Sequence, residues 1–164
     1  MARIVILGCA GTGKTTLARQ LGGCTSVPVI SLDAVWQPHW TEKNVPAFRR
    51  LMQEAHAADN WISDGNFAVA TFDIRLPRAT QIVWLEASKL TCSWRVIARV
   101  FKPGEAHRVG RLAEVLLFVW RFNRINRPRI EALIVAHGRN VPVRRLKSRR
   151  EIAAFLKSYR SVDH

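Results

Sequence analysis

Residues 8–15 read Gly8-Cys9-Ala10-Gly11-Thr12-Gly13-Lys14-Thr15 and match the pattern Gly-x-x-x-x-Gly-Lys-Ser/Thr at every fixed position. The run before the motif, Arg3-Ile4-Val5-Ile6-Leu7, is apolar and rich in β-branched residues, which predicts a buried parallel strand. Residues 16–21 have a helical composition, and Gly22-Gly23 are expected to end that helix. The motif therefore lies between a strand and a helix, the context in which such a loop binds phosphate.

The chemistry of this loop follows from its residue types. Glycines let backbone N–H groups converge on phosphate oxygens, and the dipole of the following helix favours negative charge. Lys14 is expected to reach the β- and γ-phosphates, and the Thr15 hydroxyl to bind Mg²⁺. The alternative, a glycine-rich turn with an accidental lysine, fits the flanking segments poorly. The residues expected to bind ATP here are Gly8, Cys9, Ala10, Gly11, Thr12, Gly13, Lys14, Thr15 and Thr16.

The length and composition indicate one α/β domain over residues 1–164, because 164 residues are few for this core plus a second domain. Hydrophobic residues make up 48% of the chain, but charges such as Arg95, Arg99, Glu114 and Arg121 interrupt every long apolar run. No membrane span is therefore expected. A cytoplasmic location is expected, because the first strand begins almost at the N-terminus and leaves no room for a signal peptide. Three widely spaced cysteines indicate neither a disulfide framework nor a zinc site.

The charge of the chain is strongly positive. There are 26 Lys and Arg residues against 12 Asp and Glu, a formal net charge of +14, with most of the excess after residue 75. A nucleic-acid partner is one interpretation. The other is that a protein handling several phosphates needs a cluster of arginines, with the remaining cations on a solvated surface.

Three acids follow predicted strands. Asp33 comes after residues 27–32, Asp64 after 61–63 and Glu86 after 81–85. The carboxyl ends of parallel strands form the edge where ligands bind. Asp64 and Glu86 both fit the acid that holds Mg²⁺ directly or through its waters, and an Asp-Gly turn without chemistry is the alternative for Asp64.

Between these strands lies a segment that could cover a substrate. Pro46 is expected to start a helix over 47–59, and Trp36, three residues beyond Asp33, is the best candidate among the tryptophans for a pocket wall. Plain packing is the alternative for each tryptophan. Arg75, in a poorly determined stretch over 68–79, is a candidate for contacting the second substrate.

The second half of the chain supplies arginines. A helix over 89–102 places Arg95 and Arg99 on one face, and residues 103–111 have the composition of a short lid between two helices. A helix over 112–126 is expected to end or kink at Pro128, before another helical piece over 129–137. The sequence does not decide which of these arginines face the site: Arg108, Arg111, Arg121, Arg124 and Arg127.

The chain closes with two further elements. Residues 141–146 predict a fifth strand, at an edge of the sheet because of Pro142. Ser148 and Glu151 have the spacing of a capping box at the start of the last helix.

Together these residues resemble the adenylate-kinase-like P-loop kinases, and among them the small DNA topology modulation proteins. The resemblance is carried by residues 8–16, 32–36, 61–67, 94–99, 127–128 and 146–151. It implies a three-layer P-loop NTPase fold: a five-stranded parallel sheet of order 2-3-1-4-5, helices on both faces, and a short lid. It also implies ATP and Mg²⁺ as cofactors.

The resemblance also assigns roles to residues. Arg95 and Arg99 match an Arg-x-x-x-Arg helix that contacts adenine and phosphate, Asp64 matches the acid beside the metal, and Asp33 matches a carboxylate that activates a hydroxyl. It therefore favours Asp64 over Glu86, which is left as a strand-end or helix-capping residue. The lid has no cysteines, which excludes a zinc-bearing lid, and no Gly-Phe-Pro-Arg follows Asp64, which argues against AMP as acceptor.

The expected activity is ATP-dependent transfer of phosphate to a small molecule, nucleoside or nucleotide, with Lys14, Asp33 and Arg99 as catalytic residues and Thr15 and Asp64 on the metal side. Two alternatives stay open. One is a nucleotide-regulated nucleic-acid-binding protein that affects DNA topology indirectly, and the other is an ATPase without an acceptor.

Overall fold

A computed structural model describes residues 1–37, 39–101 and 110–160. Five strands form one parallel sheet in the order β2-β3-β1-β4-β5, as expected. The strands are β1 (Arg3–Gly8), β2 (Val29–Ser31), β3 (Trp61–Asp64), β4 (Gln81–Leu85) and β5 (Val143–Leu146). Because all run the same way, β1, β3 and β4 end at one edge, which is where the phosphate loop begins.

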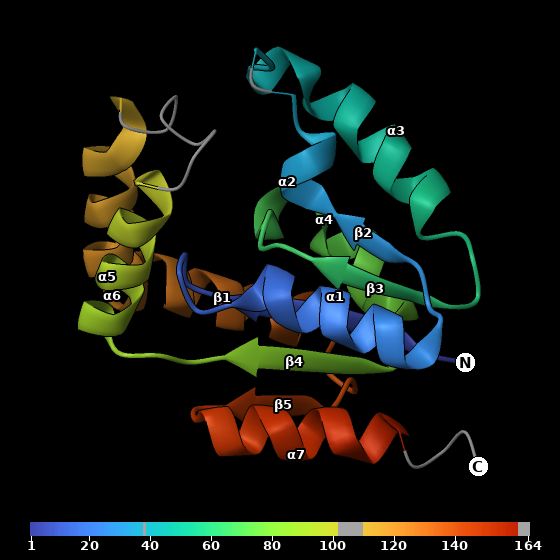
Figure 1. Ribbon diagram of the computed structural model, residues 1–164. Coiled ribbons are helices and arrows are strands. Elements are labelled where there is room, and N and C mark those ends of the chain that lie inside the picture. Colours follow the sequence, from blue (N-terminus) through green and yellow to red (C-terminus); the bar gives the residue numbers. More distant parts are fainter. Residues whose placement is uncertain (38, 102–109, 161–164) are drawn as a thin grey trace.

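Helices cover both faces of the sheet. The α-helices are α1 (Lys14–Thr25), α2 (Leu32–Val35), α3 (Val45–Ala55), α4 (Ala68–Arg75), α5 (Lys89–Val100), α6 (Leu112–His137) and α7 (Arg149–Arg160), and the 3₁₀ turns are η1 (Glu42–Asn44) and η2 (Leu76–Arg78). Figure 1 shows α5 and α6 on one side of the loop after β1, and α2 and α3 on the other.

Alternation along the buried strands explains the layers. In β1, Val5 and Leu7 pack with α4, α5 and α6, whereas Ile4 and Ile6 pack with α1 and α7. Successive side chains of a strand point to opposite faces, so an unbroken apolar run predicts a strand buried on both sides. The segment before the phosphate loop is therefore packed on both faces.

The first helix does not end at its glycine pair. Helix α1 continues through Gly22 and Gly23 to Thr25, so the predicted stop is wrong. A Cβ atom on Gly22 would lie 2.7 Å from a methyl group of Val29 and 3.1 Å from the carbonyl oxygen of Val27. Gly22 is therefore needed for the close packing of α1 against the start of β2.

Pro128 does not end a helix either. It lies inside α6, a single helix over Leu112–His137 that joins the two pieces expected from the sequence. Buried residues before Pro128, such as Phe122, and after it, such as Ile130, belong to the same hydrophobic cluster. Packing of both halves offsets the missing backbone N–H and the steric clash of the ring.

The C-terminal elements follow the prediction. Strand β5 is an edge strand, and Pro142 stands just before it. Ser148 accepts a hydrogen bond from the backbone N–H of Glu151 at 3.2 Å, and the Glu151 carboxylate accepts one from the N–H of Lys147 at 2.8 Å. Among the described residues, no helix has both the length and the apolar character that crossing a membrane requires.

Candidate functional site: a phosphate-binding loop at the carboxyl edge of the sheet

The loop after β1 has a backbone that only glycine adopts easily. Gly8, Gly11 and Gly13 have φ angles of 146°, 81° and 99°. A Cβ atom would lie 2.5 Å from the carbonyl oxygen of Leu85 at Gly8, and 2.5 Å from that of Cys92 at Gly11. At Gly13 nothing lies within 4 Å of such an atom, so this side of the loop is open to a ligand.

Bonds within the loop hold it in shape. The Thr12 hydroxyl donates to the carbonyl oxygen of Cys9 at 2.8 Å, and Lys14 Nζ donates to the same oxygen at 2.9 Å. Burial lowers the pKa of Lys14, while the nearby charges of Asp64 and Asp33 raise it. The ammonium group therefore lies over the loop, bonded to the carbonyl oxygen of Cys9, where the charges of both strand-end aspartates act on it.

Asp64 ends β3 directly beside the start of α1. Its Oδ2 accepts a hydrogen bond from the Thr15 hydroxyl at 2.7 Å, and the residue is only 2% exposed. Burial raises the pKa of Asp64, and the bond from Thr15 and the charge of Lys14 lower it. Its other oxygen, Oδ1, is buried and has no hydrogen-bond partner among the described residues. A buried carboxylate oxygen without a partner is unfavourable, and a cation or its water would satisfy it.

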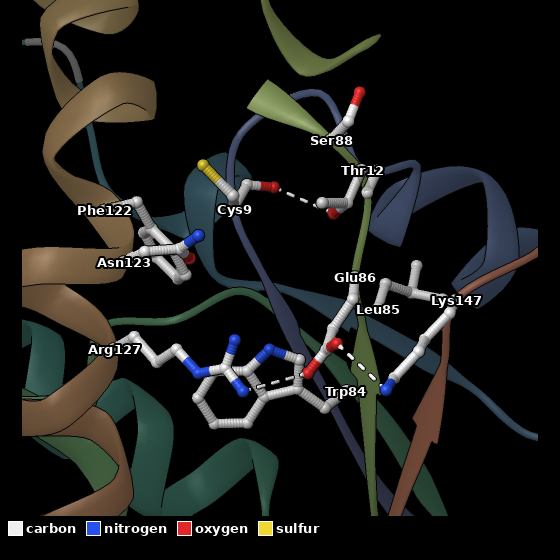
Figure 2. A pocket seen from close by; sticks show the side chains of 11 residues that line it. Cys9, Thr12, Trp84, Leu85, Glu86, Ser88, Phe122, Asn123, Arg127 and Lys147 are labelled. Carbon is white, nitrogen blue, oxygen red and sulfur yellow. Dashed lines mark hydrogen bonds and ion pairs between the residues drawn. The ribbon is translucent and has the colours of Figure 1, made fainter. Parts of the chain in front are cut away.

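Glu86, the competing acid, is held in ion pairs with basic side chains (Figure 2). Its Oε1 lies 2.7 Å from Arg145 Nη1 and 3.2 Å from Arg127 Nη2. The same two arginines pair with Glu131, at 2.8 and 3.2 Å. Glu86 thus lies at the end of β4, in a cavity of about 230 Å³, within an ion-pair network. Ser88, not Glu86, caps α5.

Asn66 is a residue of this edge that the sequence reasoning missed. Its side-chain amide donates to the carbonyl oxygen of Gly8 at 2.9 Å and accepts from the N–H of Gly8 at 3.2 Å. This reciprocal pair fastens the start of the phosphate loop to the segment after β3. The sequence did offer a signal, because Asn66 stands two residues beyond Asp64 at the same strand end, but only Asp64 and Gly65 were interpreted there.

Arg75 does not face a substrate. It is fully buried and donates to Ser63 Oγ at 3.0 Å, to the carbonyl oxygen of Gly65 at 3.1 Å and to that of Asn66. Burial lowers its pKa to about 9. The guanidinium group thus holds the backbone that follows Asp64, which makes Arg75 a positioning residue and corrects the expectation from the sequence.

A buried histidine extends this network. His56 Nε2 lies 2.9 Å from Ser63 Oγ and Nδ1 lies 2.7 Å from the carbonyl oxygen of Met52. Burial lowers the pKa of His56 to about 4, so the ring is neutral at pH 7. A neutral ring donates from Nδ1 to Met52 and accepts the Ser63 proton at Nε2.

Asp33 lies in α2, just beyond the end of β2, and is exposed. Beside it, aromatic rings form a cluster, with Trp36 at centroid distances of 5.6 Å from Trp40, 5.2 Å from Phe48 and 5.8 Å from Phe67. Trp36 and Phe67 are only partly buried, so the cluster both packs α3 against α2 and presents ring surface next to Asp33.

Arg95 and Arg99 lie on α5 across from the loop. Arg95 Nη1 donates to the carbonyl oxygens of Gly11 at 3.2 Å and Thr12 at 3.3 Å, while Arg99 is exposed. Both line a groove of about 400 Å³ between the loop, α1, α5 and α7. Arg95 thus bonds to the loop itself, and Arg99 is the cation of this pair that is exposed to a ligand.

The remaining arginines are sorted by their partners. Arg127 pairs with Glu86 and Glu131, and Arg111 with Glu114. Arg121 and Arg124 are exposed on α6. Arg108 and the expected lid, apart from residues 110 and 111, lie outside the described residues. Part of the positive charge of the chain is therefore used in internal bonds.

Two of the three cysteines meet behind the loop. Cys9 and Cys92 are both buried in one cluster, and the interaction of their thiols raises the pKa of Cys9 and lowers that of Cys92. They are thiols of the core, and they join the loop to the start of α5.

Comparison with solved structures identifies the fold as that of P-loop kinases. The chain is similar to shikimate kinase from Bacteroides thetaiotaomicron, with a TM-score of 0.63 and 20% identity over 98% of this chain and 97% of that one. It is also similar to a gluconokinase from Sinorhizobium meliloti 1021, with a TM-score of 0.56 and 16% identity over 98% and 90% of the two chains.

A sugar kinase from Janibacter sp. HTCC2649 has the same arrangement, with a TM-score of 0.56 and 15% identity over 99% of this chain and 92% of that one. No protein-family model and no curated protein matches the sequence. At these identities the likeness defines the fold, and the resemblance to DNA topology modulation proteins has no support among these neighbours.

Proposed function

We propose that this protein is an ATP-dependent phosphotransferase that transfers the γ-phosphoryl group of ATP to a hydroxyl of a small molecule. The observation that supports this proposal is an open glycine loop at which Lys14 bonds to the Cys9 carbonyl oxygen and Thr15 bonds to the buried Asp64. Structural neighbours named as kinases of small molecules support a small acceptor rather than a nucleic acid.

The position of the nucleotide follows from the loop and the groove. The triphosphate would lie against the open side of the loop at Gly13, with the backbone N–H groups at the start of α1 as donors. The base would lie in the groove of about 400 Å³ between α5 and α7. Pockets of this size are typical for small ligands.

The residues at the end of β3 fit a magnesium ion. Thr15 offers a hydroxyl and Asp64 a carboxylate whose Oδ1 has no partner within the described part of the chain, and both are oxygen ligands of the kind Mg²⁺ prefers. The described residues hold no cluster of three or more His, Cys, Asp or Glu, which suits an ion completed by phosphate oxygens and water. When bound, the ion would neutralise charge on the phosphates.

The transfer itself needs little covalent chemistry from the protein. The acceptor oxygen attacks the γ-phosphorus, the bond to the oxygen bridging the β- and γ-phosphorus breaks, and the electron pair stays on ADP. Asp33 would orient the acceptor hydroxyl and take its proton. Lys14 and Arg99 would stabilise the charge spread over the transferring group, which makes positioning and electrostatics most of the catalysis.

The test is a screen for ADP formation from MgATP with nucleosides, nucleotides, sugars and other hydroxylated compounds, with and without nucleic acid. One class of compound should raise ADP formation above the rate measured without an acceptor. Lys14→Ala should lower the rate measured with that compound on the order of 100-fold or more. Arg139→Ala is the matched control, because Arg139 is an exposed cation in the turn before β5, at the other end of the strands.

Each other result would contradict the proposal. Equal ADP formation with and without every acceptor would indicate an ATPase, and ADP formation stimulated by nucleic acid alone would indicate a nucleic-acid-dependent protein. An unchanged rate in Lys14→Ala would remove the loop from the chemistry.

A further inference from the structure

A large aromatic side chain lies exposed in the groove beside the phosphate loop. Trp94, on α5, is 71% exposed, and it lines the groove together with Ala98 of the same helix. The other wall carries Leu17 and Gln20 of α1 and Ile152 of α7. The groove opens at Gly11 and Gly13, so a molecule whose phosphates lie on the loop has this space for its remainder.

We infer that Trp94 is the stacking platform for the base of the nucleotide, and that it gives the site a preference for purine nucleotides. This inference rests on the proposed function. Its basis is that an apolar ring surface left in water becomes favourable when a planar base covers it. Stacking depends on the area of the two π-faces, so a two-ring purine gains more than a one-ring pyrimidine.

The neighbouring Arg95 is bonded to the phosphate loop. The resemblance assigns Arg95 and Arg99 together to adenine and phosphate, but the Arg95 guanidinium donates to the carbonyl oxygens of Gly11 and Thr12. These bonds fix it against the loop at the inner end of the groove. Trp94 has no ring partner among the described residues, whereas Trp36 and Trp61 both pack against other rings. The exposed indole is therefore the aromatic group of the groove that is available for stacking.

The position of Trp94 on α5 separates it from the other exposed apolar residues of this helix. Leu90, one turn earlier, is 72% exposed, but it does not line the groove. General surface hydrophobicity would affect both residues alike. A role in base binding would depend on Trp94 and not on Leu90, so Leu90 provides a matched control.

The test is calorimetric titration of the full chain with MgATP and with magnesium tripolyphosphate, a probe that has the phosphates but no base. Trp94→Ala should weaken MgATP binding roughly tenfold and leave tripolyphosphate binding unchanged. Leu90→Ala should change neither. The wild-type protein should bind ATP and GTP more tightly than CTP and UTP, and Trp94→Ala should reduce this difference.

Fluorescence gives a second measurement. ATP should quench the emission of the wild-type protein through a base stacked on Trp94, and Trp94→Phe should lose most of this quenching. Trp120→Phe should keep it, because Trp120 is a half-exposed tryptophan on α6 that does not line the groove.

The outcomes separate this inference from the proposed function. MgATP binding that is unchanged in Trp94→Ala, or equal losses for MgATP and tripolyphosphate, would overturn the role of Trp94 and leave the phosphate loop intact. A wild-type protein that binds neither probe would overturn the nucleotide site, and the inference with it.

Discussion

The buried His56 makes the stability of the fold depend on pH in a way that can be calculated. Burial lowers its pKa from 6.5 to about 4. Between these values the unfolded chain binds a proton that the folded chain does not, so the stabilisation is complete above pH 6.5 and is lost as the pH falls toward 4. From pH 8 to pH 5 the free energy of unfolding should fall by about 2 kcal/mol from this group alone.

The perturbation that isolates this effect is His56→Gln, since a glutamine side chain can bond to Ser63 and Met52 without titrating. The stability of both proteins is measured by urea unfolding at pH 8 and pH 5. The free energy of unfolding of the wild type, minus that of His56→Gln, should be about 2 kcal/mol smaller at pH 5 than at pH 8. The contributions of other titrating groups cancel in this difference.

The positive charges of Arg75 and Arg78 also disfavour protonation of His56, so the neutral ring suits its surroundings. His39→Gln is the control, because His39 is exposed and should leave the pH dependence of the wild type unchanged. Parallel curves for wild type and His56→Gln between pH 8 and pH 5 would refute the account of a neutral ring bonded to Ser63.

Three further changes test the parts of the fold that shape the site. Gly11→Ala should destabilise the protein by about 1–3 kcal/mol and lower ATP affinity, because a Cβ atom would lie 2.5 Å from the Cys92 carbonyl oxygen at a positive φ; unchanged melting would contradict this. Asn66→Ala should weaken ATP binding with a loss of about 1–3 kcal/mol in stability, measured by calorimetry and urea unfolding, since Gly8 loses both bonds; full retention of both properties would exclude the role. Pro128→Ala should raise stability by about 1–3 kcal/mol by restoring a backbone bond inside α6, and a lower urea midpoint would show that the proline is needed there.

The sequence was most informative where local pattern and tertiary role agree. The glycines of the phosphate loop have positive φ angles, which glycine adopts most easily. Ile4 and Val5 are buried on opposite faces of the sheet, as an unbroken apolar strand predicts. The edge position of β5 followed from Pro142. The order of the strands came from the resemblance, because pairing between distant segments leaves no mark in local composition.

The sequence was least informative where packing decides. Gly22 has the appearance of a helix stop, yet contact with Val29 explains it. Arg75 has the appearance of a ligand contact, yet its guanidinium bonds to the backbone after Asp64. Trp94 was part of the resemblance but was given no role, and only the structure shows it 71% exposed. Such residues are defined by neighbours far away in the chain.

Asp33 is the residue on which the proposed transfer reaction depends most directly. It lies in α2, its charge acts on Lys14, and it belongs to neither the loop nor the residues expected to hold the metal. Replacing it with asparagine removes a proton acceptor while keeping the size and polarity of the side chain.

The most direct test is ³¹P NMR of the reaction of MgATP with an acceptor, for wild type and Asp33→Asn. The wild type should give ADP and a new phosphate ester signal, and Asp33→Asn should form the ester about 10²- to 10⁴-fold more slowly while binding MgATP with unchanged affinity. Ester formation at the wild-type rate in Asp33→Asn would contradict the role of this residue. A wild type that binds MgATP and forms no ester with any hydroxyl compound would contradict the phosphotransferase.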